Sequence, residues 1–288
     1  MRRFEGKVSV VTGGGSGIGR AAALRLAKEG SKVLVADLNL EGAEETAKRI
    51  ADAGGEAVAI RCNVSKEADA KATIDAAVEK WGKLDVLANV AGVGGFKRTL
   101  DTSLEDWQRM LDVNLTGTFL MCREALPHVL KTKGAIVTTA SIAGVKSHPY
   151  SAAYCASKGG VVLLTKALAV EYARKNVRIN CVCPGGVETP LIASFQLPPG
   201  GSQQQLMRIA PIMDRMALPE EVAAAIAFLA SDEASYVCGA TLVVDGAMSA
   251  LRNHRTTKPR SPAREQEEGT WQRTGSGRSQ RSRRRASR

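Results

Sequence analysis

The chain has 288 residues, of which 44% are hydrophobic and 24% charged, as in a soluble domain with a substantial core. No apolar run approaches the roughly 20 residues of a membrane-spanning helix, and the first residues do not read as a signal peptide. We therefore expect a cytoplasmic protein without a membrane partner. The net charge of +11 is concentrated in residues 250–288, which hold 12 Lys/Arg and 3 Asp/Glu, against 28 and 26 in residues 1–249.

Short segments rich in Val and Ile alternate with segments rich in Ala, Leu, Glu and Lys. The first kind predicts strands buried on both faces, at 7–12, 32–37, 56–64, 84–92, 134–141 and 177–185, with a last strand at 240–246. The second kind predicts amphipathic helices, among them 19–30, 41–55 and 219–234. This alternation predicts an α/β fold: a doubly wound, Rossmann-type parallel sheet with helices on both faces, in a single domain of residues 1–249.

The tail, residues 250–288, is rich in Arg, Ser, Gly and Pro and poor in aliphatic residues, so we expect a disordered basic tail. The simpler interpretation is an appended extension without a role. The alternative is a basic arm that binds nucleic acid or anionic membrane. Aromatic residues that would stack on bases are not interleaved with its basic residues, which disfavours nucleic acid.

No metal site is expected, because the three histidines, His128, His148 and His254, stand at no ligand spacing from a cysteine. The six cysteines form no CxxC pair, and Cys181 and Cys183 alternate along a predicted strand. This pattern indicates reduced core residues in the cytosol.

A glycine-rich loop, TGGGSGIGR, follows the first predicted strand and opens the first predicted helix. Without side chains, backbone N–H groups and the helix N-terminus can approach a pyrophosphate. The order strand, loop, helix favours dinucleotide binding over a tight turn alone. The predicted contacts in this loop are Thr12, Gly13, Ser16, Gly17, Ile18 and Gly19.

The second predicted strand ends at Asp37, about 20 residues beyond the loop. A carboxylate there accepts hydrogen bonds from the adenosine ribose and repels a 2′-phosphate. Residues 38–40 include no Lys or Arg, so NAD(H) is the preferred cofactor; Arg20 leaves NADP(H) open. The alternative is that Asp37 or Asn39 only caps the next helix.

Tyr154 and Lys158 stand four positions apart, in the run YSAAYCASKGG. On a helix they share one face, and an ammonium group beside a phenol favours the phenolate and so lowers the pKa of the tyrosine. The pair is either a proton-transfer device or an ordinary surface pair. Tyr150 lies nearer the start of the run and is expected to line a pocket or the surface.

Six motifs in order resemble those of short-chain dehydrogenase/reductases, in their short single-domain branch. They are TGGGSGIG, NVAG at Asn89, VNLTG at Asn114, TTASIAG with Ser141, YCASK and PGGVET at Pro184. The resemblance runs from about residue 7 to residue 246 and leaves out the tail. It implies that this chain folds and acts as those enzymes do.

The resemblance implies that Tyr154 is the general acid/base and that Lys158 lowers its pKa and binds the nicotinamide ribose. Ser141 would position the substrate oxygen, and Asn114 would support a proton-relay water. Further implied cofactor contacts are Asn63, Val64, Asn89, Ala91, Gly92, Pro184, Gly185, Val187 and Thr189. Asn63 and Val90 depart from the commoner Asp and Asn, and Ala247 from a second glycine. Family members are commonly homotetramers, so we expect a homo-oligomer.

The implied function is NAD-dependent interconversion of a secondary alcohol and a ketone, a small-molecule substrate. Reduction of a 3-oxoacyl thioester is an alternative. A second alternative is a catalytically silent dinucleotide-binding scaffold or sensor with a nucleic-acid-binding tail. Serine hydrolysis lacks a G-x-S-x-G elbow, and the extended epimerases need a longer substrate domain. Residues 190–216, with Leu, Ile, Phe and Met around a Gly/Pro centre, are expected to cover the substrate pocket.

Overall fold

A computed structural model describes residues 2–207, 209–210 and 212–250 of the chain. The expected disordered tail therefore lies outside the described residues, apart from Ala250.

The described residues form a seven-stranded sheet in the order β3-β2-β1-β4-β5-β6-β7, with every neighbouring pair parallel. The strands are β1 Val8–Thr12, β2 Lys32–Asp37, β3 Ala57–Arg61, β4 Val86–Asn89, β5 Ala135–Thr139, β6 Arg178–Pro184 and β7 Thr241–Val244. All seven predicted strands are confirmed. Several predicted segments are longer than the strands, because their last residues form loops at the carboxyl edge of the sheet.

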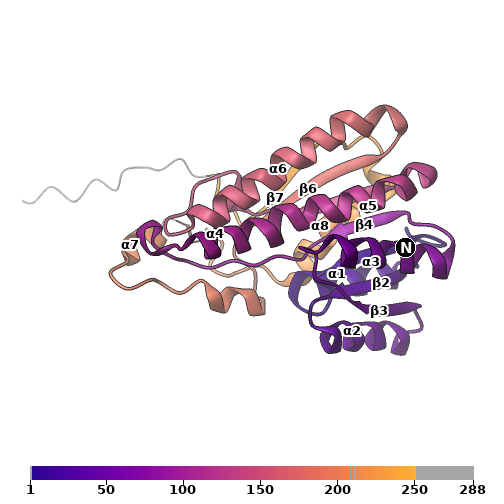
Figure 1. The fold of residues 1–288 in the computed structure, drawn as a ribbon, viewed down its shortest axis with the longest axis horizontal. Helices are drawn as coiled ribbons and strands as arrows, with labels where there is room; N and C mark the ends of the chain where they lie inside the picture. Colours follow the sequence, from indigo (N-terminus) through magenta and orange to yellow (C-terminus); the bar gives the residue numbers. More distant parts are fainter. Residues whose placement is uncertain (1, 208, 211, 251–288) are drawn as a thin grey trace, which may run out of the picture. The chain divides into compact units, whose positions relative to one another are not determined.

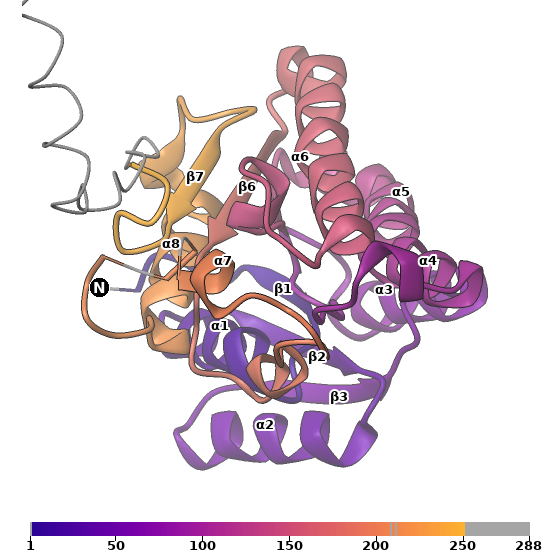
Figure 2. The same cartoon turned by 90° about the vertical axis from the view of Figure 1, so that its left-hand side faces the viewer.

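Helices cover both faces of the sheet (Figures 1 and 2). One face carries α1 Gly17–Lys28, α2 Leu40–Asp52 and α8 Pro219–Ala230, and its core includes Leu26, Val35 and Ile226. The other carries α3 Glu67–Trp81, α5 Gly117–Thr132 and α6 Ala152–Tyr172, with Leu34, Ile74 and Met121 in its core. Two shorter helices, α4 Leu104–Leu111 and α7 Gln203–Met207, lie outside these layers, and α4 packs on α6. The doubly wound Rossmann-type architecture is confirmed.

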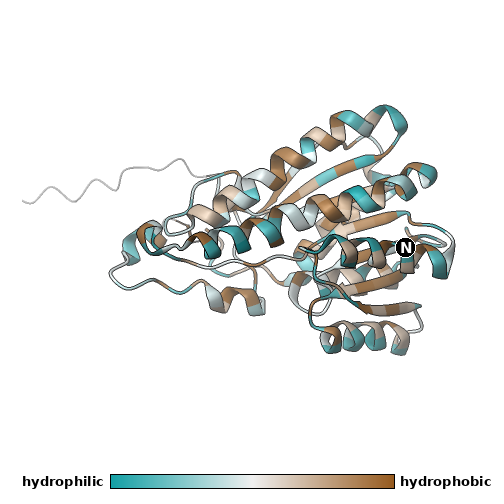
Figure 3. Cartoon of the chain, viewed as in Figure 1, coloured by the Kyte–Doolittle hydropathy of each residue, from teal (hydrophilic) through white to brown (hydrophobic). Residues whose placement is uncertain are grey.

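Local sequence explains where the elements begin and end. Gly30 and Gly54 follow α1 and α2 with φ of +102° and +81°, a left-handed backbone that glycine adopts without strain. β1, β4 and β5 are buried along their whole length, and Figure 3 shows hydrophobic residues on the strands and mainly hydrophilic ones on α2. Burial of both sheet faces accounts for the continuously apolar strands.

The segment Ala152–Lys175, which begins with α6, is long and apolar enough to cross a membrane by composition, with a mean hydropathy of 1.2. In the fold it packs against β5, β6 and α4. Its apolar character is that of a core helix lying against a sheet.

The strand order also locates a crevice. The chain moves outward from β1 to β3 and then returns to place β4 on the other side of β1. Loops after β1 and β4 therefore leave the sheet in opposite directions. In open α/β sheets, ligands bind at the carboxyl ends of the strands where the order reverses in this way.

Candidate active site

The loop after β1 is packed so closely that glycine is required. Gly13 has a φ of +66°, and a Cβ atom there would lie 2.8 Å from Cα of Ala91. A Cβ atom on Gly17 would lie 2.9 Å from Cγ2 of Thr189, and one on Gly19 would lie 2.0 Å from the carbonyl oxygen of Gly13. Gly13, Gly17 and Gly19 line the cavity at the start of α1, where backbone N–H groups favour an anion.

Asp37 closes β2 at the same edge. Its Oδ2 accepts a hydrogen bond from the Gly15 N–H at 2.9 Å, and its Oδ1 accepts one from the Asn39 N–H at 2.9 Å. Asn39, not Asp37, caps α2, because its side chain accepts from the N–H of Gly42. A carboxylate has about four acceptor positions, so Asp37 keeps capacity for two ribose hydroxyls.

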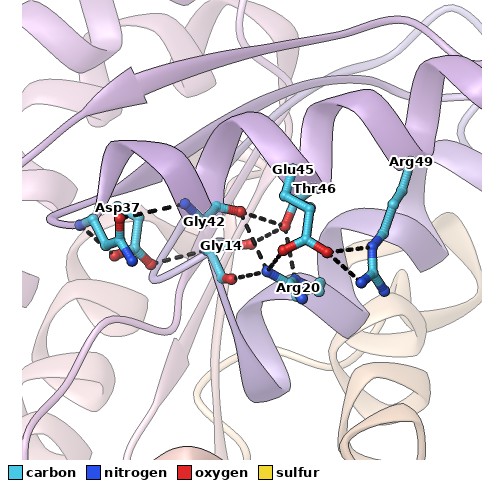
Figure 4. A network of polar contacts seen from close by, with 9 residues as sticks. Gly14, Arg20, Asp37, Gly42, Glu45, Thr46 and Arg49 are labelled. Atoms are coloured by element: carbon cyan, nitrogen blue, oxygen red, sulfur yellow. Dashed lines mark hydrogen bonds and ion pairs between the residues drawn. The ribbon is translucent and has the colours of Figure 1, made fainter.

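Arg20 points away from this role and into a network between α1 and α2 (Figure 4). Its Nε donates to Oγ1 of Thr46 at 3.0 Å, and its terminal nitrogen donates to the carbonyl of Gly15 and forms an ion pair with Glu45 at 2.9 Å. Glu45 also pairs with Arg49. The guanidinium that could have bound a 2′-phosphate is therefore already engaged with protein groups.

Thr12 and Asn89 join β1 to the loop after β4. The Thr12 hydroxyl accepts hydrogen bonds from the N–H groups of Val90 (3.0 Å) and Ala91 (3.2 Å). The Asn89 amide donates to the carbonyl of Thr118 at 3.3 Å. These contacts tie the loop after β4 to β1 and to α5, beside the crevice.

α6 places Tyr154 and Lys158 on its buried face, where they are only 8% and 4% exposed. The Lys158 Nζ donates to the carbonyl of Thr139, at the end of β5, at 2.9 Å, and lies 5.9 Å from the centre of the Tyr154 ring. Ser141 follows β5; its hydroxyl accepts from the N–H of Ala143 at 3.1 Å, and it lines the same cavity as Tyr154 and Lys158. The structure thus brings the three predicted residues together.

The charge states of Tyr154 and Lys158 follow from their burial. Burial raises the pKa of Tyr154 to about 12, and the hydrogen bond from Ser141 only partly opposes this. Burial lowers the pKa of Lys158 to about 8. In the chain without ligand, loss of water therefore dominates the pKa of Tyr154, and the expected lowering of this pKa by Lys158 stays a prediction. In this state Tyr154 is a neutral phenol at pH 7, suited to donate a proton.

Asn114 lies in a π-helical turn, Asp112–Thr116, between α4 and α5, and is fully buried. Its Oδ1 accepts from the N–H of Val93 at 2.8 Å, and its Nδ2 donates to the carbonyl of Val93 at 2.9 Å and to Oγ of Ser157 at 3.0 Å. Its side chain therefore fastens the loop after β4 to α6, beside Lys158. The proton-relay water stays a prediction.

Two cavities along the carboxyl edge share six lining residues, Ile18, Val90, Gly92, Val93, Thr189 and Leu191. The first, of about 470 Å³, is lined by the glycine loop, Asp37, Asn63 and Val64. The second, of about 280 Å³, is lined by Ser141, Tyr154, Lys158 and the segment Pro184–Val187. The shared residues make them one groove, and almost every predicted cofactor contact lines it. Together they have the volume of a small-molecule site.

A family model described as enoyl-(acyl carrier protein) reductase matches residues 13–249. The chain is 44% identical to cyclohexanol dehydrogenase of Acinetobacter sp. (strain SE19) over 250 residues, 86% of this chain and 97% of the relative. It is also 44% identical to 3beta-hydroxysteroid dehydrogenase 1 of Eggerthella lenta, over 85% of this chain and 95% of the relative. This chain belongs to the short-chain dehydrogenase/reductase family.

A solved structure of a family member agrees. The 3-ketoacyl-(acyl-carrier-protein) reductase from Brucella melitensis, complexed with NADH, superposes with a TM-score of 0.78 at 38% identity. The match covers 85% of this chain and all but 1% of the other. The short-chain dehydrogenase/reductase fold thus accounts for nearly the whole described chain.

Two departures from the family pattern have visible consequences. Asn63 turns its Oδ1 toward Ser65, accepting from the N–H at 3.1 Å and the hydroxyl at 2.8 Å. This oxygen is therefore already engaged within the loop, and the Asn63 amide nitrogen is the group left to meet a ligand in the cavity. Ala247 has a φ of +66°, a left-handed conformation in which a second glycine would be unstrained.

Sequence reasoning did not single out the two aromatic contacts of Phe195 or the place of His148. Phe195 packs edge-on against Tyr154 and Phe96, with ring centres 5.4 and 5.1 Å apart. Tyr150 lies beside this group and anchors α7, because its hydroxyl donates to Gln205 at 2.6 Å. His148 lines the cavity over Ser141. Only tertiary folding brings residues 96 and 195 to Tyr154.

Lys158→Met is expected to stabilise this short-chain dehydrogenase/reductase at pH 7 by about 1–3 kcal/mol, because no described carboxylate pairs with the buried ammonium. The pKa of Lys158 is about 8 in the fold against 10.5 in the unfolded chain. The unfolded state binds more protons between these values, so the wild type gains stability as pH rises from 8 to 10.5. The advantage of the variant should therefore shrink across this range.

Urea unfolding at pH 7 and at pH 10 measures this difference, and Lys166→Met, an exposed position on the same helix, is the control. A loss of stability at pH 7, or an advantage that does not change with pH, would show that the burial of Lys158 carries no electrostatic cost.

Proposed function

We propose that the chain is an NAD-dependent oxidoreductase that interconverts a secondary alcohol and a ketone. One observation carries the proposal: Ser141, Tyr154 and Lys158 converge in a groove whose other part contains the glycine loop and Asp37. In this fold a nicotinamide dinucleotide binds across the crevice, so its two ends can occupy the two parts of the groove. The groove therefore offers a cofactor site and a proton-transfer group within one continuous space.

The residues divide the chemistry as follows. A bound nicotinamide supplies or accepts the hydride. Tyr154 gives its phenolic proton to the ketone oxygen in reduction and takes the alcohol proton in oxidation. Ser141 holds the same substrate oxygen by a hydrogen bond. Lys158, charged below about pH 8, binds the ribose and compensates a phenolate at Tyr154.

The preference for NAD(H) is supported by Asp37 and by the engagement of Arg20. A 2′-phosphate at the end of β2 would meet the Asp37 carboxylate. Leu38 follows it, carries no charge and is 58% exposed, whereas Arg61, the neighbour of Asp37 on β3, is an exposed cation at this edge of the sheet. NADP(H) stays the alternative that a direct comparison decides.

The substrate class is supported by the cavity and by the relatives. The cavity over Tyr154 is mainly apolar, with Leu191, Ile192 and Phe195 among its lining residues. Relatives named cyclohexanol dehydrogenase and 3beta-hydroxysteroid dehydrogenase point to a carbon-rich secondary alcohol. Reduction of a 3-oxoacyl thioester is the second candidate, favoured by the likeness to a 3-ketoacyl-(acyl-carrier-protein) reductase.

A homotetramer in the cytoplasm is expected from the family resemblance. Exposed apolar side chains on α4 and α6, at Leu104, Leu163 and Val170, support contacts between copies. A catalytically silent scaffold is disfavoured, because Asn114, Ser141, Tyr154 and Lys158 are all present.

The test is a panel of secondary alcohols with NAD, and of ketones and 3-oxoacyl thioesters with NADH, followed by NADH absorbance. We expect turnover of secondary alcohols by the full chain and by residues 1–249 alike. Turnover of none of them, together with salt-dependent DNA binding that needs residues 250–288, would favour the scaffold instead.

A further inference from the structure

The cavity over the catalytic residues contains a histidine that the proposed chemistry does not use. His148 lies in the loop before α6 and lines this cavity together with Ser141, Tyr154 and Met248. Neither ring nitrogen forms a hydrogen bond within the described part of the chain, and Nε2 is also shielded from solvent. Buried ring nitrogens in proteins normally have a partner. His148 therefore lacks the bond that a purely structural histidine would make.

The imidazole is neutral under physiological conditions. Burial, with a contribution from the charge of Lys146, lowers the pKa of His148 to about 4. A neutral imidazole offers one N–H donor and one nitrogen acceptor. It can therefore bind a hydroxyl or a carbonyl oxygen, and it would not select a carboxylate by charge.

His148 is a polar group in a mainly apolar cavity. Apolar side chains form most of the cavity wall, among them Ile142, Leu191, Ile192, Phe195, Met216 and Met248. Thr139 is the other lining residue with an unpaired side-chain oxygen, but it is only 7% exposed and its carbonyl already accepts from Lys158. His148 is half-buried and lies on a loop, so it can turn toward a ligand more easily.

We infer that His148 hydrogen-bonds a second oxygen of the substrate, so that the substrate is a secondary alcohol bearing another hydroxyl or carbonyl oxygen. A diol or a hydroxyketone fits this class; a hydrocarbon alcohol does not. The inference rests on the proposed alcohol–ketone chemistry at Ser141 and Tyr154. Its physical basis is that a site built to hydrogen-bond an oxygen discriminates against the analogue that lacks it, because the buried partner is then left unpaired.

The test compares matched pairs of substrates that differ by one oxygen. Cyclohexane-1,2-, 1,3- and 1,4-diols are compared with cyclohexanol, and 2,3-butanediol with 2-butanol, as the ratio of kcat/KM values with NAD. The wild type should favour at least one diol of the panel. His148→Phe, which keeps an aromatic ring and removes both nitrogens, should lower that ratio by about 10–100-fold.

Two further variants make the result specific. His148→Asn keeps a donor and an acceptor. Its ratio of kcat/KM for diol over mono-alcohol should therefore lie nearer to that of the wild type than to that of His148→Phe, on a logarithmic scale. Ser147→Ala changes an exposed neighbour that lies outside the cavity and should leave the ratio at the wild-type value. If His148→Phe does not fold, as judged by circular dichroism and NADH binding, the comparison of wild type with His148→Asn and His148→Gln replaces it; a ratio that is the same in all three would then overturn the inference.

The outcomes separate the two proposals. If the wild type oxidises no secondary alcohol, the proposed function fails. If it oxidises cyclohexanol and the diols equally well, and His148→Phe leaves the ratio unchanged, the function stands and the role of His148 is rejected.

Discussion

Tyr154→Phe should lower kcat for alcohol oxidation by about 10²–10⁴-fold, the range that a positioned general acid/base contributes. The phenyl ring keeps the packing against Phe195, whose ring centre lies 5.4 Å away, and loses only the hydroxyl. The glycine loop and Asp37 are untouched, so the Kd for NADH, measured by fluorescence titration, should change by less than about threefold. Chemistry is lost while cofactor binding remains.

Tyr236→Phe is the matched control, because Tyr236 is fully exposed and lines none of the described cavities around the site. It should behave as the wild type does. Undiminished turnover by Tyr154→Phe would reject the assignment of the proton-transfer group. Lost turnover together with lost NADH binding would mean that the substitution had disturbed the groove.

Asp37→Ala should raise the ratio of kcat/KM for NADP over NAD by about 10–100-fold, since it removes a charge-assisted acceptor for the ribose and a repulsive carboxylate. The structure adds a second effect that the sequence did not predict. Asp37 also holds the Gly15 and Asn39 N–H groups, each at 2.9 Å, so the loop loosens and efficiency with both cofactors falls. The ratio isolates the first effect from the second.

A double variant, Asp37→Ala with Leu38→Arg, sharpens the test by supplying a cation at an exposed position. It should favour NADP further, and Glu44→Ala on the exposed side of α2 should change nothing. Steady-state kinetics with both cofactors gives the ratio. An unchanged ratio in both Asp37 variants would place the cofactor preference elsewhere.

The sheet and the glycine loop could be read from the sequence because local pattern dictates them. Buried parallel strands are continuously apolar. Gly13, Gly17 and Gly19 are required because a Cβ atom at any of them would lie less than 3.0 Å from another atom. The π-helical turn around Asn114 could not be predicted, because no residue type marks it and the Asn114 side chain bonds to Val93 and Ser157, which are distant in the sequence. The convergence of Phe96 and Phe195 on Tyr154 likewise depends on tertiary packing.

The pKa of Tyr154 shows a second limit of sequence reasoning. A spacing of four residues correctly places Lys158 on the same helix face, but it says nothing of burial. In the fold both groups lose water, which raises the pKa of Tyr154 to about 12 and lowers that of Lys158 to about 8. Proximity alone predicts the opposite direction for the tyrosine. Adding a bound, positively charged nicotinamide would supply the further charge that a phenolate needs.

The most direct measurement is therefore a pH titration of the tyrosine ultraviolet absorbance, taken as wild type minus Tyr154→Phe, with and without NAD. Our account predicts that Tyr154 ionises near pH 12 in the free protein and at a clearly lower pH when NAD is bound. A Tyr154 signal that stays near pH 12 with NAD bound would contradict the proposal that this phenol exchanges the substrate proton.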